Sequence, residues 1–435
     1  MSSPFQVAEH VIDGQYIREY PRATATPDAP LKLCIKQYTP VDNPNPQPGD
    51  ITIVATHGTG FPKELYEPLW EELLARSKED GVRIRSIWIA DAANQGASGV
   101  INEQNLGNDP SWYDHSRDVI HMINHFRAQM TRPIVGIGHS LGATQLVFAS
   151  LMHPRLFNSL VLIEPHMTDN ALAGDGPLFV AMSTKKRDVW PSREEAAENS
   201  LKVLKAWDSR VFELWKKYGY RDLPTAMYPA PKDGTRPVTL TTTKHQETIM
   251  YTRPNVKRHT QLGVPQPQAY TEPKPGETGP PPHDPLLFPD VLGPLLPDQK
   301  SYRSESILAY KMVEHIRPSV LYVSASHSPL GKGGEHADAA RRTGTRFGGS
   351  GGMEAGRVQY VRIKKAGHTV PQEKVAETAS VLGPWIKQEI QRWQEDEARI
   401  SEDWRDRPIR EKSGLPLDWN EVIGSLRLPK RPAKI

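Results

Sequence analysis

The sequence has very little cysteine: Cys34 is the single thiol among 435 residues. One thiol forms no disulfide within the chain, and it excludes a cluster of thiolate ligands around a metal ion. Histidines and carboxylates are scattered along the sequence, and no H-E-x-x-H motif is present. We therefore expect neither a disulfide scaffold nor a bound metal or cofactor, and we expect Cys34 to be a buried residue of a strand at 31–38.

An excess of one charge and a long apolar run are also lacking. The chain has 54 basic and 51 acidic residues, a balance that does not indicate a nucleic-acid-binding surface but still allows an anionic substrate. No apolar run is long enough to span a bilayer, and residues 1–14 lack the basic and apolar regions of a secretory signal. We expect one large domain with an insertion, without a nucleic-acid partner or a membrane span.

The most informative motif that is present is Gly138-His139-Ser140-Leu141-Gly142. It follows an apolar segment at 133–137 and precedes a helix-like segment at 141–152. In a G-x-S-x-G turn between a strand and a helix, the glycines allow close backbone approach and the serine hydroxyl is exposed for attack on an acyl group. The pattern predicts Ser140 as a nucleophile; the alternative is a glycine-rich turn with an incidental serine.

Short β-rich segments alternate with helical patterns over most of the chain. Residues 7–20 and 31–38 are expected to form an opening antiparallel pair. Further strands are expected at 51–56, 81–90, 134–138, 160–163, 320–324 and 358–363, and helices at 65–77, 112–130, 141–152 and 375–400. This alternation predicts an α/β fold with a mostly parallel central sheet and helices on both faces. The core then comprises residues 1–165 and 317–400.

The alternation stops after residue 165, so residues 166–316 are expected to form a cap over the strand ends. Within the cap, residues 193–218 have an amphipathic helical pattern. Residues 254–297 contain 12 of the 40 prolines, which excludes a regular helix or a central strand. This proline-rich arm extends across the surface or over a neighbouring subunit of a homodimer, or it is an exposed linker. Residues 401–435 are expected to form a C-terminal tail.

A serine nucleophile needs a base. After the last expected strand, the loop Gly367-His368-Thr369 places an imidazole at a strand end, where it can accept the Ser140 proton and return one later. The order of nucleophile and histidine resembles that of α/β-hydrolases. We predict His368 as the base; the alternative is a loop histidine that caps the final helix. Weaker candidates in other turns are His57, His139, His166 and His327.

The acid departs from the commonest α/β-hydrolase pattern. An aspartate is expected after the strand at 320–324, but residues 324–328 read SASHS. Glu164 instead follows the apolar strand at 160–163, where a carboxylate would be desolvated at a cost unless it were paired. We predict Glu164 as the acid that orients His368, with Asp169 as the alternative. A structural ion pair between Glu164 and an arginine of the cap is the other possibility.

An acyl-transfer site also needs N–H donors for an oxyanion. Leu141, at the start of the expected helix, supplies one. The turn that follows the strand at 51–56 supplies the second, from Thr59 or, alternatively, from Gly60. Because the elbow residue is serine rather than aspartate, the carboxylate-nucleophile chemistry of epoxide hydrolases and dehalogenases is not expected.

The last three residues are Ala433-Lys434-Ile435, a small, a basic and an aliphatic residue. The tripeptide is a conservative variant of the Ser-Lys-Leu peroxisomal address, and Lys430 and Arg431 precede it. We expect recognition by the peroxisomal import receptor and a location in the peroxisome matrix. The alternative is a solvated basic tail.

Several longer stretches carry a more specific resemblance: THGTGFPKELYEPLW, GHSLGA, HPRLFNSLVLIEP, RDVWPSREEA, RDLPTAMYP and GGSGG. They resemble the fungal peroxisomal α/β-hydrolases that include the acyl-CoA hydrolase of mycophenolic acid biosynthesis and the toxin-biosynthesis hydrolases. The resemblance extends over nearly the whole chain and implies an α/β-hydrolase fold with a long cap. It also implies an acid at the position of Glu164, where the related acyl-CoA hydrolase has aspartate.

The expected function is therefore hydrolysis of an acyl-CoA thioester in fungal secondary metabolism, with CoA specificity implied by the resemblance. Ser140, His368 and Glu164 are the expected triad. Cap residues at 185–187, Lys-Lys-Arg, are candidates for contact with the CoA phosphates, unless they are simply solvated. The alternatives are a carboxylesterase or lipase with the same triad and a non-catalytic binding protein.

Overall fold

The structure is a computed structural model that describes residues 3–169, 176–231, 235–253, 303–416 and 418–424. The chain divides into two compact units, Met1–Glu389 and Ile390–Ile435. The second unit contains the end of α13 (Val375–Trp404) and two short helices, α14 (Ile409–Ser413) and α15 (Trp419–Ile423). The residues of the candidate site, the cap and the core discussed below all belong to the first unit.

The main sheet of the described chain has eight strands. In their order across the sheet, these are β1 (Phe5–Asp13), β2 (Lys32–Pro40), β4 (Ile84–Ala90), β3 (Ile51–Thr56), β5 (Ile134–His139), β6 (Ser159–Ile163), β10 (Ser319–Ala325) and β11 (Val358–Ile363). The β1–β2 and β2–β4 pairs are antiparallel, and every other pair is parallel. The predicted α/β fold, with its antiparallel opening and parallel centre, is confirmed.

Two details of the opening strands differ from expectation. The strand expected over 7–20 ends at Asp13: Gly14 N still donates to the Leu31 carbonyl at 2.7 Å, but Gln15 N donates to a side chain instead, the Asp118 carboxylate, at 2.7 Å. Cys34 lies on β2 as expected but is only partly buried. Side chains alternate along a strand, so Cys34 faces away from the core that holds its neighbours Leu33 and Ile35.

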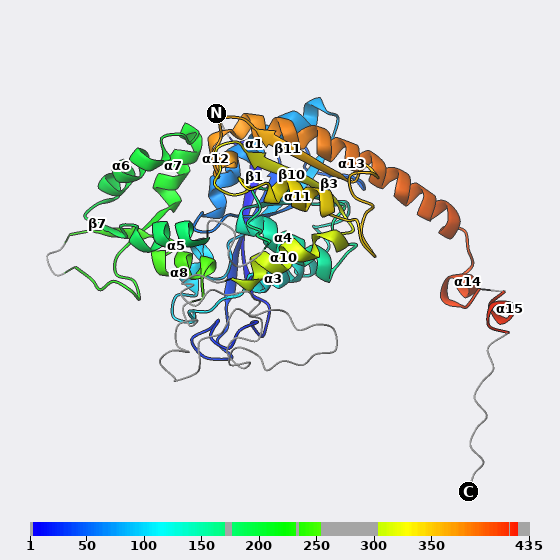
Figure 1. Cartoon of the computed structure of the whole chain (residues 1–435), viewed down its shortest axis with the longest axis horizontal. Helices are drawn as coiled ribbons and strands as arrows, with labels where there is room; N and C mark the ends of the chain where they lie inside the picture. Colours follow the sequence, from blue (N-terminus) through cyan, green and yellow to red (C-terminus); the bar gives the residue numbers. More distant parts are fainter. Residues whose placement is uncertain (1–2, 170–175, 232–234, 254–302, 417, 425–435) are drawn as a thin grey trace, which may run out of the picture. The chain divides into compact units, whose positions relative to one another are not determined.

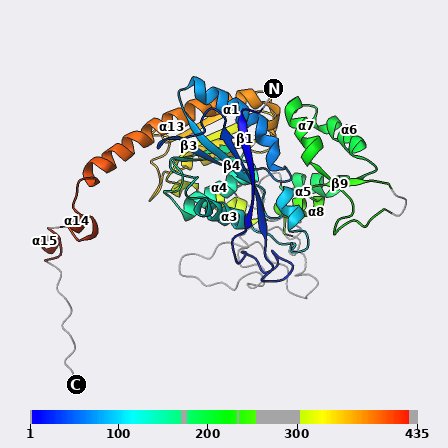
Figure 2. The same ribbon diagram turned by 180° about the vertical axis from the view of Figure 1, so that it is seen from behind.

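Helices cover both faces of the sheet, with α1 on one side and α3, α4 and α10 on the other (Figure 1; Figure 2 shows the reverse view). A large apolar cluster fills the space between the sheet and α3, α4 and α10. The helix α10 falls within the segment 166–316 expected to form the cap, but its residues Ala309 and Tyr310 belong to this core cluster. The bounds are α1 (Glu67–Glu79), α2 (Gly96–Ile101), α3 (Trp112–His125), α4 (Leu141–Met152), α10 (Ser304–Met312), α11 (Glu335–Arg342) and α12 (Val370–Glu373), with single 3₁₀ turns η1 (Lys63–Tyr66) and η2 (Val313–His315).

The cap follows β6 and has a small antiparallel sheet of its own, in the order β7–β9–β8. Its elements are α5 (Gly176–Lys185), β7 (Val189–Trp190), α6 (Arg193–Leu204), α7 (Ser209–Tyr218), β8 (Tyr220–Asp222), β9 (Val238–Leu240) and α8 (Lys244–Tyr251). The helical segment expected at 193–218 is two helices, because Asp208 starts α7 by accepting a bond from Arg210 N at 2.9 Å. The proline-rich arm at 254–297 lies outside the described residues.

None of the described helices combines the length and the apolar character that a bilayer crossing requires.

Candidate active site

Ser140 lies in the sharp turn between β5 and α4, with a positive φ of 55° and a ψ of −122°. Such a backbone is strained for a residue with a side chain, and it projects the side chain out of the turn. The flanking glycines make the turn possible: a Cβ at Gly142 would lie 2.5 Å from the carbonyl oxygen of His57, and one at Gly138 would lie 2.6 Å from Cα of Ala143. The turn is thus a nucleophile elbow.

His368 lies in the loop between β11 and α12, with Nε2 2.9 Å from Oγ of Ser140. Two backbone bonds hold this loop. His327 N donates to the carbonyl of Ala366 at 2.9 Å, and Gly367 N donates to the Glu373 carboxylate at 2.7 Å. The His368 side chain is 16% exposed, so the ring that contacts the serine is largely shielded from water.

Glu164 follows β6 and is fully buried, with Oε2 3.2 Å from Nδ1 of His368. Its other partners come from the end of β10: Ala325 N donates to Oε1 at 2.6 Å, and the Ser328 hydroxyl donates to Oε2. The end of β10, where an acid is usual, therefore supplies donors to the carboxylate that follows β6, its neighbour in the sheet. These donors give the buried carboxylate the hydrogen-bond partners that a buried polar group needs.

The alternatives for Glu164 differ in position and partners. Asp169 is exposed, in contrast to the buried Glu164. No arginine is among the partners of Glu164 in the described residues, where Ala325, Ser328 and His368 contact it. The structure thus brings Ser140, His368 and Glu164 together in one continuous chain of contacts.

The turn after β3 lies beside the elbow and narrows the choice of oxyanion donor. Gly60 N donates to the Gln95 side chain at 2.7 Å, so this N–H group is already engaged. The N–H groups of Thr59 and Leu141, in contrast, have no acceptor among the residues that the structure describes. Of the two candidates in this turn, Thr59 is therefore the one whose N–H group can donate to an oxyanion.

A buried tyrosine, Tyr66, and a buried histidine, His139, connect the parts of the site; the sequence motifs did not indicate Tyr66 and indicated His139 only as a weaker candidate base. Gly58 N donates to the Tyr66 hydroxyl at 2.8 Å, and Tyr66 Oη lies 2.7 Å from Nδ1 of His139. Nε2 of His139 donates to the His368 carbonyl at 3.0 Å, so the tyrosine O–H donates to the remaining ring nitrogen. Burial, reinforced by the nearby His368, lowers the pKa of His139 to about 3. We call this chain the Tyr66–His139 relay.

The other candidate histidines have different surroundings. His57 accepts a bond from Ala92 N at 2.9 Å, and burial lowers its pKa. Burial also lowers the pKa of His166 to about 3, with its ring among Trp112 and Tyr251. His327 is exposed. Of all the candidate histidines, His368 is the one that contacts the serine hydroxyl.

The cap contacts the loop that carries His368. The ring centroid of Phe179, on α5, lies 5.4 Å from that of His368. Trp207, between α6 and α7, donates its indole N–H to Thr369 Oγ1 at 3.1 Å, and the next cap residue donates its backbone N–H to the Gln372 carbonyl at 2.8 Å. The cap thus shields the site and bonds directly to the base loop.

The basic residues at 185–187 are less available than the sequence suggested. Lys186 pairs with Glu247 at 2.7 Å, and Arg187 pairs with Glu195 at 2.9 Å. Lys185 is exposed. In the described residues, no group of three or more histidine, cysteine or carboxylate side chains has an arrangement that could hold a metal ion.

A serine, histidine and carboxylate at the strand ends of a mostly parallel sheet define a class of hydrolase, and comparison with known proteins agrees. The profile of the alpha/beta hydrolase family matches residues 53–381. Peroxisomal alpha-beta-hydrolase Lpx1 of Saccharomyces cerevisiae has a similar structure, with a TM-score of 0.64 at 16% identity over 89% of this chain and 90% of that one. The chain therefore belongs to the alpha/beta hydrolase family.

Closer sequence relatives are fungal. Type I acyl-CoA thioesterase mpaH of Penicillium brevicompactum is 37% identical, over 96% of this chain and 95% of its own length. The protein of the same name from Penicillium roqueforti is also 37% identical, over 97% and 96% of the two chains. The resemblance to fungal acyl-CoA hydrolases that the sequence motifs indicated is confirmed.

Proposed function

We propose that this protein hydrolyses acyl-CoA thioesters through an acyl-enzyme on Ser140. The observation that carries the proposal is the continuous contact from Ser140 Oγ to His368 Nε2, at 2.9 Å, and from His368 Nδ1 to Glu164, at 3.2 Å. The unengaged N–H groups of Thr59 and Leu141 complete the site, because an oxyanion needs such donors.

In the acylation step, Ser140 Oγ attacks the thioester carbonyl while His368 takes the serine proton. Negative charge develops on the carbonyl oxygen, which the Thr59 and Leu141 N–H groups stabilise. The carbon–sulfur bond then breaks and the CoA thiolate leaves. A thiolate is a good leaving group, so the bond can break before the proton moves, and the His368 imidazolium then gives its proton to the thiolate and becomes a neutral base again.

In the deacylation step, His368 removes a proton from water, and the resulting nucleophile attacks the acyl-enzyme. The ester bond to Ser140 breaks, the serine recovers its proton from His368, and the free acid leaves. Glu164 keeps the imidazole oriented and stabilises its positive charge in both steps. A buried carboxylate with two further donors is suited to this task, because its own position is fixed.

We propose a thioester rather than an ester because the relatives named as acyl-CoA thioesterases align with this chain over nearly their full length. A carboxylesterase would use the same three residues. We therefore compare CoA release from a panel of acyl-CoA thioesters with hydrolysis of the matched p-nitrophenyl esters, using purified protein and Ser140→Ala as the blank. We expect higher kcat/KM for the thioesters; ester hydrolysis without CoA release would contradict the proposal.

We further propose a peroxisomal location, on the strength of the Ala433-Lys434-Ile435 tripeptide and the preceding basic pair. The import receptor would be its partner there. An N-terminal fluorescent fusion of the full chain should co-localise with a peroxisomal matrix marker, and deletion of the tripeptide should move it to the cytosol without loss of activity. Import of the truncated chain would contradict the assignment.

A further inference from the structure

The cap contains a cavity of about 310 Å³, a volume within the range of small-molecule binding sites. It lies among α6, α7 and the small cap sheet, and one residue of the core, Phe61, contributes to its wall. Its lining is dominated by aromatic and aliphatic side chains, chiefly Phe61, Trp190, Leu204, Trp207, Trp215 and Leu240. Such a lining favours an apolar ligand.

The charged groups of the wall are already paired, whereas the Trp190 indole N–H is a buried donor without a hydrogen-bond partner among the described residues. Lys186 and Arg187 also line the cavity, but each forms an ion pair, with Glu247 and Glu195 respectively. The Ser200 hydroxyl bonds the Tyr220 hydroxyl. A phosphate group would find cations already neutralised, so the cavity is a poor match for the nucleotide of CoA and a good match for an uncharged group.

The oxyanion turn borders this cavity through Phe61, and the loop that carries His368 is bonded to Trp207, a cap residue of the cavity wall. Phe61 lies two residues after Thr59, and its ring stacks on His139 with centroids 6.0 Å apart. Trp207 packs edge-on against Phe61 at 5.6 Å and donates its indole N–H to Thr369, the residue after His368. A ligand in the cavity is therefore in contact with the supports of both the oxyanion turn and the base.

We propose that the cap cavity binds the apolar end of the substrate's acyl group. This inference rests on the proposed function and adds a substrate class: acyl groups with an extended aliphatic or ring-containing apolar end. Burial of each added methylene should raise kcat/KM by about fourfold until the cavity is filled.

Leu204→Trp tests the cavity, with Leu201→Trp as a matched control. Both leucines lie on α6, but Leu204 lines the cavity whereas Leu201 is 50% exposed and does not. We expect Leu204→Trp to lower kcat/KM for decanoyl-CoA at least tenfold, mainly through KM, and to change that for acetyl-CoA less than threefold. Leu201→Trp should leave both unchanged. An equal effect of Leu204→Trp on the two substrates, or no effect, would overturn the proposal.

The opposite change keeps the test decisive if the larger side chain impairs folding. Leu204→Ala enlarges the cavity and should move the preferred acyl length upward, with thermal unfolding as the check on folding. An unchanged length preference in a folded Leu204→Ala variant would count against the cavity as the acyl site.

N-Acetylcysteamine thioesters, which lack the nucleotide of CoA, identify the part of the substrate that the cavity binds. We expect Leu204→Trp to show the same dependence on acyl length with these substrates. Loss of that dependence would assign the cavity to CoA and overturn the proposal. If the wild-type protein cleaves no thioester, the proposed function fails, whereas a p-nitrophenyl ester series still tests the acyl cavity independently.

Discussion

The core site and the cap cavity are built in contrasting ways. In the core, the polar groups around Ser140 are buried and bonded to one another: Glu164 has three partners, and His139 bonds both Tyr66 and His368. In the cap, the wall is apolar and the strands are short; β7 has two residues. This contrast fits the two proposals, in which buried hydrogen bonds of the core position the reacting groups and the apolar cap cavity binds the acyl end of the substrate.

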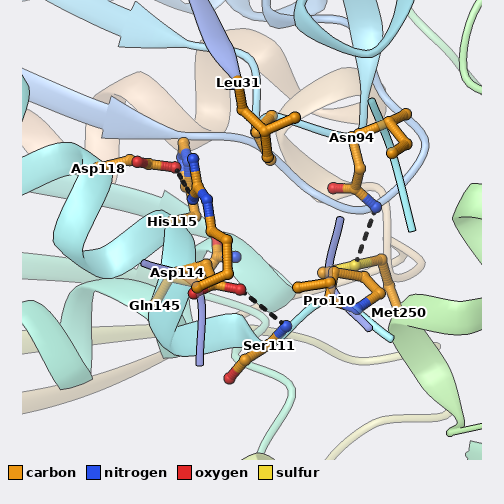
Figure 3. A pocket seen from close by; sticks show the side chains of 14 residues that line it. Leu31, Asn94, Pro110, Ser111, Asp114, His115, Asp118, Gln145 and Met250 are labelled. Carbon is orange, nitrogen blue, oxygen red and sulfur yellow. Dashed lines mark hydrogen bonds and ion pairs between the residues drawn. The ribbon is translucent and has the colours of Figure 1, made fainter. Parts of the chain in front are cut away.

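A second and smaller cavity lies in the core, and its lining differs from that of the cap cavity. It has a volume of about 20 Å³, room for a single water molecule, and Asp114, His115 and Asp118 line it (Figure 3). Neither ring nitrogen of His115 has a hydrogen-bond partner among the described residues. This polar pocket suits an internal water, whereas the larger cavity in the cap suits an apolar ligand.

The largest effect should come from the core nucleophile. Ser140→Ala removes the attacking oxygen, and His368→Ala removes the base; because the two act as a unit, each should lower kcat/KM by a factor of about 10⁴ or more. CoA release measures the loss, and thermal unfolding should show that the variants remain folded. Activity near the wild-type level in a folded Ser140→Ala variant would refute the site.

The acid should come next in magnitude. Glu164→Gln keeps the size of the side chain but removes the charge that favours the His368 imidazolium, so kcat should fall by about 10²- to 10⁴-fold. Glu164→Asp should be milder, since it keeps the charge. Asp169→Asn is the matched control, because it makes a similar change at an exposed carboxylate of the same segment. It should change kcat little. The reverse ranking would move the acid to Asp169.

The residues of the triad could be found from the sequence because each is marked by a local pattern. The glycines around Ser140 and the apolar strand before Glu164 are adjacent to the residues that they identify, and the histidine loop follows a strand in the same way. The partners of Glu164 could not be found so readily. Ala325 contributes only a backbone N–H, and Ser328 lies 164 positions from Glu164 in the chain.

The cap was less predictable for a physical reason. One amphipathic pattern covers both α6 and α7, and a short turn at 205–208, which ends at the α7 N-cap Asp208, separates them. The cavity depends on how distant aromatic side chains meet, such as Phe61 and Trp207. Hydrophobic periodicity identifies the buried face of a helix, but it does not specify which residues of other elements will face it.

The Tyr66–His139 relay should have an intermediate effect. Tyr66→Phe leaves Gly58 N–H without an acceptor and removes the donor to His139, so both the oxyanion turn and the base loop lose support. We expect kcat to fall about tenfold. Tyr322→Phe is the matched control, because that buried hydroxyl bonds Thr343 at 2.7 Å instead of a residue of the site. Equal kcat losses in the two variants would show that the Tyr66–His139 relay does not position the residues of the site.

The bond from the cap to the base loop should contribute less. Trp207→Phe keeps an aromatic wall but removes the N–H donor to Thr369, which should lower kcat about fivefold for short acyl substrates, the effect of one hydrogen bond. Thr369→Val should produce a similar loss, and Thr369→Ser, which keeps the hydroxyl, should not. If Trp207→Phe and Thr369→Val act additively when combined, the bond does not position His368.

The smallest predicted effect concerns the stability of the polar core. Burial lowers the pKa of His115 to about 3, whereas an unfolded histidine titrates near 6.5, as a rough reference value. The unfolded state therefore binds more protons below that pH, and stability falls as the pH decreases. His115 should account for about 0.7 kcal/mol of the loss between pH 7 and pH 6.

Urea unfolding at the two pH values measures this term. His115→Leu should reduce the pH dependence by that amount, because the titrating group is gone. His125→Leu, which replaces an exposed histidine of the same helix, should leave the pH dependence unchanged. An identical pH dependence in wild type and His115→Leu would mean that His115 is not held neutral in the folded core.

Fluorophosphonate titration with parallel measurement of CoA release tests the central claim most directly. We expect one probe per chain, located by peptide mass spectrometry on Ser140, and a loss of acyl-CoA hydrolysis in proportion to labelling. Ser140→Ala should neither react nor release CoA above the blank. Full thioesterase activity in completely labelled protein, or labelling of another residue that accounts for the lost activity, would contradict the account.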